Sequence, residues 1–249
     1  MLQAIRAEGS RPPLFVVHGL HGVMGIGHAM GRALDRDQPL YALHARGIGG
    51  TEPPDRSMED MLSGYLAEIR AVRPHGPYVI GGVCSGGLIA MELARTLAGQ
   101  GETLRPVVLL DPPPAPCSIG HPNPTGDPGV YRHLYIGVEH VFRSFINQFG
   151  DLPFDVNDPV QLHRAIDVGI QTLITLCRHA PPRFEGETVL IASVERAFGY
   201  LYPQGPWQKI VPTPGSMHLI RGNHVDFFYQ HLDEVLRLLR FVLDTPFES

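Results

Sequence analysis

The chain has 249 residues, of which 43% are hydrophobic and 18% charged, and its net charge is −5. This length suits one domain whose core is large enough to fold without a metal ion or disulfide bonds. Nucleic-acid binding needs a concentrated positive face, which an acidic chain without a basic block lacks. We also expect neither secretion nor membrane insertion, because no apolar signal segment and no apolar run approaching 18 residues is found.

Cysteine is scarce in this chain. Cys84, Cys117 and Cys177 form an odd set without metal-ligand spacing. Such a set argues against a disulfide framework and a zinc site, and it favours a reducing compartment. We therefore expect a cytoplasmic protein that binds no metal ion.

Short apolar runs alternate with helical patterns along most of the chain, which is typical of a mostly parallel sheet covered by helices on both faces. In chain order we expect a strand at 14–18, a helix at 23–34, a strand at 40–44, a helix at 57–72 with Ser57 as its N-cap, a strand at 78–81, a helix at 88–98, strands at 107–110, 189–192 and 217–220, and a closing helix at 225–243. The fold class is therefore α/β.

One region interrupts the alternation. Between Pro112 and Phe184 a proline-rich stretch is followed by two helical patterns, near 130–149 and 158–179, with no strand candidate between them. Connections of this length are uncommon unless they have a structure and a function of their own. We expect one domain over 1–249, with a helical lid inserted at 115–182.

The segment most informative about chemistry is Gly82-Val83-Cys84-Ser85-Gly86, between the strand at 78–81 and the helix at 88–98. Gly-x-nucleophile-x-Gly at a strand-to-helix turn is the nucleophile elbow of α/β hydrolases, here with cysteine at its centre. The strained central residue requires small neighbours two positions away, and the helix N-terminus lowers the pKa of a thiol. A small buried cysteine in a glycine-rich turn is the alternative, but the strand and helix around Cys84 favour a nucleophile.

A cysteine nucleophile needs a base and an acid that orients it. His224 follows the last strand, where its side chain can reach the carboxyl edge of the sheet, whereas His218 lies within that strand and His231 partway along the closing helix. For the acid, we favour Asp111 at the end of the strand 107–110 over Glu195, which follows the next strand.

Three further assignments complete the predicted site. Asp226 is interpreted as an N-terminal helix charge rather than as the acid. The oxyanion that forms during acyl transfer needs backbone N–H donors. We expect these from Ser85 and from Leu20 in the turn His-Gly-Leu-His-Gly, with His21 as the alternative to Leu20.

Nearly the whole chain resembles the thioesterase domains that end non-ribosomal peptide and polyketide synthases. The matching segments are PPLFVVHGLHG, IGGVCSGGLIAMELARTLAGQG, VVLLDPP, RHAPPRFEGETVLIAS, the isolated Trp207 and IRGNHVDFF. The resemblance implies an α/β-hydrolase fold with a helical lid, and a nucleophile, acid and base at Cys84, Asp111 and His224. It departs from the family at Cys84, since most members carry serine there.

The resemblance also implies a function. The domain would bind no cofactor itself, and would take an acyl or peptidyl chain from the phosphopantetheine arm of a carrier protein and release it by hydrolysis, cyclisation or aminolysis. Three alternatives remain: a standalone editing thioesterase, a small-molecule hydrolase resembling dienelactone hydrolase, whose acid would be Glu195, and a non-catalytic relative that binds an apolar ligand.

Overall fold

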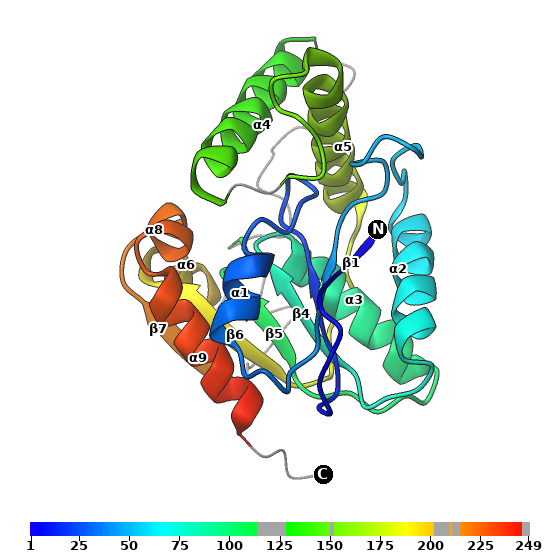
Figure 1. Cartoon of the computed structure of the whole chain (residues 1–249), viewed down its shortest axis with the longest axis vertical. Helices are drawn as coiled ribbons and strands as arrows, with labels where there is room; N and C mark the ends of the chain where they lie inside the picture. The colour runs from blue at the N-terminus through cyan, green and yellow to red at the C-terminus, as the bar shows by residue number, and fades with distance from the viewer. Residues whose placement is uncertain (114–127, 150–151, 202–209, 211–214, 246–249) are drawn as a thin grey trace.

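The computed structural model describes residues 1–113, 128–149, 152–201, 210 and 215–245. Within them a seven-stranded sheet has the order β1-β3-β2-β4-β5-β6-β7, in which only the pair β1 and β3 is antiparallel (Figure 1). The strands are β1 Leu2–Arg6, β2 Leu14–Val17, β3 Leu40–Leu43, β4 Val79–Val83, β5 Val107–Leu110, β6 Thr188–Ser193 and β7 Ser216–Ile220. The predicted mostly parallel α/β sheet is confirmed. The edge strand β1 was not predicted.

The helices are α1 Gly27–Ala33, α2 Met58–Val72, α3 Gly86–Gly99, α4 Pro128–Phe149, α5 Pro159–Arg178, α6 Val194–Leu201, α8 His224–Tyr229 and α9 Leu232–Asp244. The Ser57 side chain accepts the N–H of Asp60 at 3.0 Å and caps α2, as predicted. Three differences matter: α1 begins four residues later than expected, α6 was not predicted, and the single closing helix is in fact α8 and α9.

The sheet separates two apolar layers because successive strand residues point to opposite faces. On one face, Ile80 of β4 packs with α2 and α3 in one buried cluster. On the other, Val79 packs with α1, α8 and α9. All four residues of β2 and all four of β5 are buried. The carboxyl ends of the central strands are therefore fixed from both sides.

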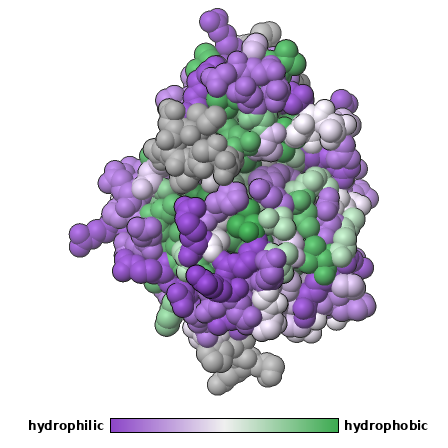
Figure 2. All heavy atoms as spheres, viewed as in Figure 1, coloured by the Kyte–Doolittle hydropathy of each residue, from purple (hydrophilic) through white to green (hydrophobic). Residues whose placement is uncertain are grey.

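Helices α4 and α5 pack against each other above the carboxyl edge of the sheet (Figure 1). Their shared core contains Phe142 of α4 and Ile166 of α5, and it extends to Val23 and Ile48 in the loops below. In the face shown in Figure 2, hydrophilic side chains cover the outer tip of this helical pair, and hydrophobic ones are seen mainly across the middle of the molecule below it. These helices lie where the sequence predicted two helices of an insertion, parts of which (115–127 and 150–151) fall outside the described residues.

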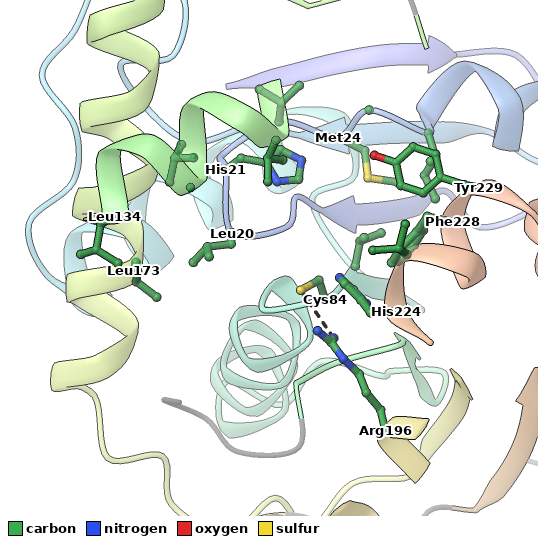
Figure 3. Close-up of a pocket in the computed structure, with 18 of the residues that line it drawn as sticks. Leu20, His21, Met24, Cys84, Leu134, Leu173, Arg196, His224, Phe228 and Tyr229 are labelled. Atoms are coloured by element: carbon green, nitrogen blue, oxygen red, sulfur yellow. Dashed lines mark hydrogen bonds between the residues drawn. The ribbon is translucent and has the colours of Figure 1, made fainter. Parts of the chain in front are cut away.

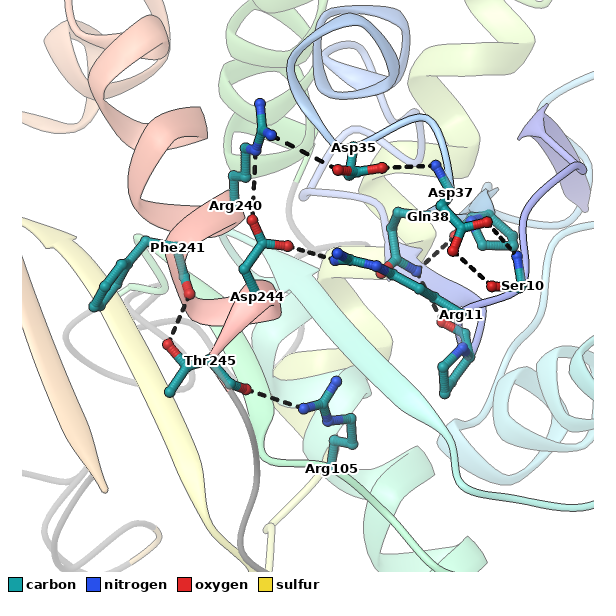
Figure 4. Close-up of polar contacts among 12 residues, drawn as sticks. Ser10, Arg11, Asp35, Asp37, Gln38, Arg105, Arg240, Phe241, Asp244 and Thr245 are labelled. Atoms are coloured by element: carbon teal, nitrogen blue, oxygen red, sulfur yellow. Dashed lines mark hydrogen bonds and ion pairs between the residues drawn. The ribbon is translucent and has the colours of Figure 1, made fainter.

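Polar contacts fix α9 against the loops at the opposite edge of the sheet (Figure 4). Arg240 contacts Asp35 at 3.7 Å and Asp244 of its own helix at 3.5 Å, and Asp244 also pairs with Arg11. The backbone oxygen of Thr245 accepts a hydrogen bond from Arg105 at 3.1 Å. Because these groups are partly exposed, each contact adds little to stability, and the buried face of α9 contributes most. In the part of the chain that the structure describes, no helix is both long and apolar enough to span a membrane.

Candidate active site

Cys84 lies at the sharp turn between β4 and α3 with a φ of 51°, in the left-handed region that side chains other than glycine rarely adopt. A Cβ on Gly82 would come within 2.2 Å of the Gly86 carbonyl oxygen, and a Cβ on Gly86 within 2.1 Å of the His18 carbonyl oxygen. The two glycines are therefore required by space. The predicted strained elbow with small residues on both sides of Cys84 is confirmed.

His224 is the first residue of α8, immediately after the N-cap Asn223. The Asn223 side chain accepts the N–H of Val225 at 2.8 Å and that of Asp226 at 3.0 Å, and the Asp226 carboxylate accepts the N–H of Asn223 at 3.2 Å. This capping box fixes the backbone that carries His224. Asp226 thus lies in the first turn of α8, as interpreted from the sequence, and it also completes the cap of that helix.

The His224 ring extends toward Cys84 and packs edge-on against Phe228, with ring centroids 5.0 Å apart (Figure 3). The two rival histidines lie elsewhere. His218 is on β7, where its ring packs edge-on against Phe241 of α9, and His231 precedes α9. Of the three, only His224 lines the cavity around Cys84.

Asp111 directly follows β5 and is fully buried, with a φ of 45°. One carboxylate oxygen accepts a hydrogen bond from His224 Nδ1 at 2.6 Å. The other accepts the backbone N–H of Ser193 at 2.7 Å and its hydroxyl at 2.9 Å. Glu195, the alternative acid, is exposed on α6. The structure therefore brings Cys84, His224 and Asp111 together and leaves Glu195 outside the group.

Arg196, which the sequence analysis did not consider, reaches the same group from α6. Its Nη1 donates to the backbone oxygen of Asp111 at 2.6 Å and lies 3.8 Å from Cys84 Sγ (Figure 3). Its Nε lies 3.7 Å from an Asp111 carboxylate oxygen. Its place in the sequence gave only a weak signal: Arg196 lies four residues after the predicted strand 189–192, and that strand end was searched only for an acid.

The electrostatics of the site favour an ion pair between Cys84 and His224. Burial raises the pKa of the Cys84 thiol, but the positive charge of His224, its hydrogen bond and the charge of Arg196 outweigh burial and lower that pKa to about 7. Burial lowers the pKa of His224, yet the Cys84 charge and the hydrogen bond to Asp111 raise it to about 9. Between these values the thiolate and the imidazolium coexist.

The turn after β2 is held by its own polar groups. The Gly19 carbonyl oxygen accepts the N–H of Gly22 at 3.0 Å and His18 Nδ1 at 2.5 Å. His18 Nε2 then accepts the hydroxyl of Tyr65 at 2.7 Å. Since the peptide that contains Gly19 C=O also contains the N–H of Leu20, that N–H points the opposite way.

The two oxyanion donors remain predictions. Within the described residues, no backbone carbonyl accepts the N–H of Leu20 or of Ser85. Both residues lie next to the thiol: Ser85 follows Cys84, and Leu20 lines the cavity that Cys84 opens into. The alternative, His21, lines the same cavity, and burial lowers its pKa to about 3, so that its ring is neutral.

Cys84 opens into a cavity of about 430 Å³ with almost entirely apolar walls. Met24 and Phe228 line one side, and Leu134 of α4 and Leu173 of α5 line another (Figure 3). Such a cavity suits an apolar acyl chain better than a charged one.

One expectation about the cysteines was wrong, and one residue that was singled out cannot be placed. Cys177 on α5 is disulfide-bonded whereas Cys84 is free, so the argument against disulfide bonding was wrong for Cys177. Trp207 lies outside the described residues. No group of three or more His, Cys, Asp or Glu side chains that could hold a metal ion is found among the residues that the structure describes.

The chain is similar to several known proteins. The family model for the thioesterase domain matches residues 12–150, more than half of the chain. The chain is 42% identical over 113 residues to malpinin synthetase of Mortierella alpina and 37% identical over 111 residues to a dimodular nonribosomal peptide synthase of Bacillus subtilis. Each match covers 45% of this chain but only 2% and 5% of those much longer proteins. Among solved structures, the NocB thioesterase domain superposes with a TM-score of 0.73 at 18% identity, covering 98% of this chain and 99% of that one. The likeness to the NocB domain shows that the two chains share a fold.

Proposed function

The chain belongs to the thioesterase domain family, and on this basis we propose that it transfers an acyl or peptidyl chain from a carrier protein's phosphopantetheine thioester to Cys84 and then releases that chain. One observation carries the proposal. The Cys84 thiol stands at a strained strand-to-helix turn, at the wall of an apolar cavity, beside a histidine that is hydrogen-bonded to a buried aspartate.

In the first step, the Cys84 thiolate attacks the carbonyl carbon of the incoming thioester and forms a carbon–sulfur bond. The tetrahedral oxyanion is stabilised by the N–H groups of Leu20 and Ser85. As the bond to the pantetheine sulfur breaks, that sulfur takes the proton from the His224 imidazolium. Asp111 holds the ring in place and stabilises its positive charge before this transfer.

In the second step, water, a hydroxyl of the chain itself or an amine attacks the thioester on Cys84 and gives its proton to His224. The Cys84 sulfur leaves as a thiolate, which restores the ion pair. These three acceptors correspond to hydrolysis, cyclisation and aminolysis. A thioester on cysteine is close in energy to the incoming one and more reactive toward amines than an oxyester, so cysteine favours a difficult second step. Each proton moves between substrate, Cys84 and His224, and we assign no bound cofactor.

The surroundings of the thiol support an acyl chain as substrate. We propose that 115–182 forms a lid, because α4 and α5 supply the apolar wall with Leu134 and Leu173. The carrier protein is proposed as partner because the synthetase relatives carry the matching segment as a small part of a long chain. A cytoplasmic location is part of the same proposal.

The small-molecule hydrolase alternative is less well supported. It requires the acid to follow β6, where Glu195 is exposed, whereas Asp111 after β5 contacts His224. No feature of the described residues favours a small-molecule hydrolase over an enzyme that acts on carrier-bound thioesters.

Intact-protein mass spectrometry after incubation with a panel of acyl-pantetheine thioesters tests the proposal. We expect an adduct with the mass of the acyl group on Cys84, located by peptide mapping, and loss of that adduct as product appears. Cys84→Ala should form no adduct. Product release at the wild-type rate by Cys84→Ala would end the proposal.

A further inference from the structure

Arg196 occupies a position that the triad does not explain. It follows β6, and its side chain is only 18% exposed. Its guanidinium is held by the Asp111 backbone oxygen at 2.6 Å rather than by solvent. Among the described residues that line the cavity, it is the only one with a permanent charge, since the rest are apolar residues, glycines, histidines, one tyrosine and Cys84.

We propose that Arg196 is a catalytic residue that holds the Cys84 sulfur as a thiolate, and that the elbow cysteine and this arginine act as one unit. The inference rests on the proposed function, in which Cys84 is the nucleophile. It is carried by the 3.8 Å contact between Arg196 Nη1 and Cys84 Sγ inside an apolar cavity.

The four ionisable groups of the site alternate in sign around a ring. Asp111 contacts His224 at 2.6 Å, the charge of His224 stabilises the thiolate of Cys84, Cys84 contacts Arg196 at 3.8 Å, and Arg196 lies 3.7 Å from Asp111. Each negative group thus has a positive neighbour on both sides. In an apolar environment, charges are attracted more strongly than in water, so removing one cation leaves the sulfur with a single positive partner.

The ring also accounts for the residue type at the elbow. A cation beside the nucleophile stabilises an anion there only if that anion forms near neutral pH, which a thiol can do and a serine hydroxyl cannot. Outside this ring of four groups, His21 gives no equivalent charge, because it stays neutral on the cavity wall. With Arg196 beside it, the nucleophile is already a thiolate before substrate binds. A serine hydroxyl, in contrast, would have to be activated during the reaction.

A purely structural role is the competing explanation, since Arg196 also binds the carbonyl oxygen of the strained residue Asp111. The two roles differ in what they do to the thiol. An anchor for the strand end can be lost without changing the pKa of Cys84, whereas the loss of a neighbouring charge raises it.

The test is the pH dependence of Cys84 alkylation by iodoacetamide, followed by peptide mass spectrometry in the absence of any acyl substrate. In Arg196→Gln we expect the apparent pKa of the thiol to rise by about one pH unit or more. Arg196→Lys, which keeps the charge, should retain most of the lowering. Glu195→Gln, a charge change on the exposed neighbour, is the matched control and should leave the titration unchanged. Thermal unfolding shows whether each variant is folded, and Arg196→Met replaces the glutamine variant if that one is not.

An unchanged thiol titration in folded Arg196→Gln or Arg196→Met would overturn the inference, as would an equal rise in the lysine and glutamine variants. Because alkylation needs no thioester, this failure differs from a failure of the proposed function. An inactive protein whose thiol still responds to Arg196 would remove the thioesterase proposal alone.

Discussion

The ends of β5 and β6 lie side by side at the same edge of the sheet, yet they present opposite charges to the site. After β5 comes a buried carboxylate, Asp111, and after β6 comes a guanidinium, Arg196. Asp111 binds His224, and Arg196 contacts the sulfur of Cys84. The two strand ends therefore act on the two members of the ion pair, each on the one of opposite sign.

The difference shows that a strand-end position does not determine a residue's role. The ends of both strands lie at the same edge of the sheet, and the sequence offered an acid after each of them. In the structure the carboxylate that contacts His224 follows β5, and a cation follows β6. Ser193 joins the two ends, since its N–H and hydroxyl both donate to Asp111 while its strand leads directly into α6.

Replacing the acid should have the largest effect of any change to these strand ends. We expect Asp111→Asn to lower kcat/KM by roughly 10³–10⁴-fold, because an amide neither stabilises the imidazolium nor holds the ring in the required tautomer. The measurement is the steady-state rate at which the acyl chain is released from an acyl-pantetheine thioester.

Glu195→Gln is the matched control and should retain full activity. A reversed result, with Glu195→Gln inactive and Asp111→Asn active, would place the acid after β6 and refute the assignment of roles to the two ends.

Changing the nucleophile removes the partner of Arg196. In Cys84→Ser we expect turnover to fall by roughly 10²-fold, which is at the low end of what proton transfer by a positioned base contributes. The hydroxyl must lose its proton during the attack, whereas the thiol has already lost its own. An acyl-oxyester should accumulate and be visible by intact mass. Turnover as fast as that of the wild type would mean that the cysteine confers no advantage.

The pH profile sharpens the comparison further. The pKa of the Cys84 thiol is lowered to about 7 and that of His224 raised to about 9, so the active ion pair is lost below the first value by protonation of sulfur and above the second by deprotonation of the ring. We expect kcat/KM to be bell-shaped between these values, each limb approaching about one log unit per pH unit. The two values belong to the coupled pair of groups.

Arg196→Gln should move the acidic limb to higher pH, and because the charge of Arg196 also lowers the pKa of His224, it should move the basic limb in the same direction. In Cys84→Ser the histidine loses the raising effect of the thiolate, so its own pKa falls and activity should rise with pH through that lower value. If the acidic limb did not move in Arg196→Gln, the residue after β6 would have no part in the ionisation of Cys84.

How much the sequence predicted follows from how local each signal is. Cys84 and its glycines form a contiguous motif between a strand and a helix, and Asp111 ends an apolar run, so both were identified from short segments. The pairing of Asp111 rather than Glu195 with His224 depends on which strand end is nearer, and residue patterns alone left both candidates open. The structure decides this in terms of contacts, and their catalytic roles stay predictions.

The elements that the sequence did not predict lack local signals. Apolar periodicity continues across both closing helices, and no glycine or proline marks the break at Gln230 and His231. There the N–H groups of both residues converge on the Asp226 carbonyl oxygen. Strand β1 is an edge strand with no fully buried residue, so its pattern carries little hydrophobic signal. Arg196 was missed for a different reason: an arginine has no motif, and only its three-dimensional neighbours give it a role.

The smallest expected effect concerns the residue that links the two strand ends. Ser193→Ala removes the 2.9 Å hydrogen bond from the hydroxyl to Asp111 but keeps the 2.7 Å bond from the backbone N–H. Because a hydrogen bond to a charged group contributes about 1.5 kcal/mol or more, the free energy of unfolding should fall by about that amount in denaturant titrations. Since His224 and the backbone still bind the carboxylate, kcat/KM should fall by less than about tenfold.

Ser63→Ala, on the exposed side of α2, is the matched control and should change neither quantity. A loss in Ser193→Ala as large as that of Asp111→Asn would mean that the hydroxyl, and not the position after β5, makes Asp111 an effective acid. The residues after β5 and β6 would then act as one unit in positioning the acid. The charge of Asp111 and that of Arg196 could not be varied separately. A small loss keeps them independent, and in that case the charge after β6 can be exchanged while the acid after β5 stays intact.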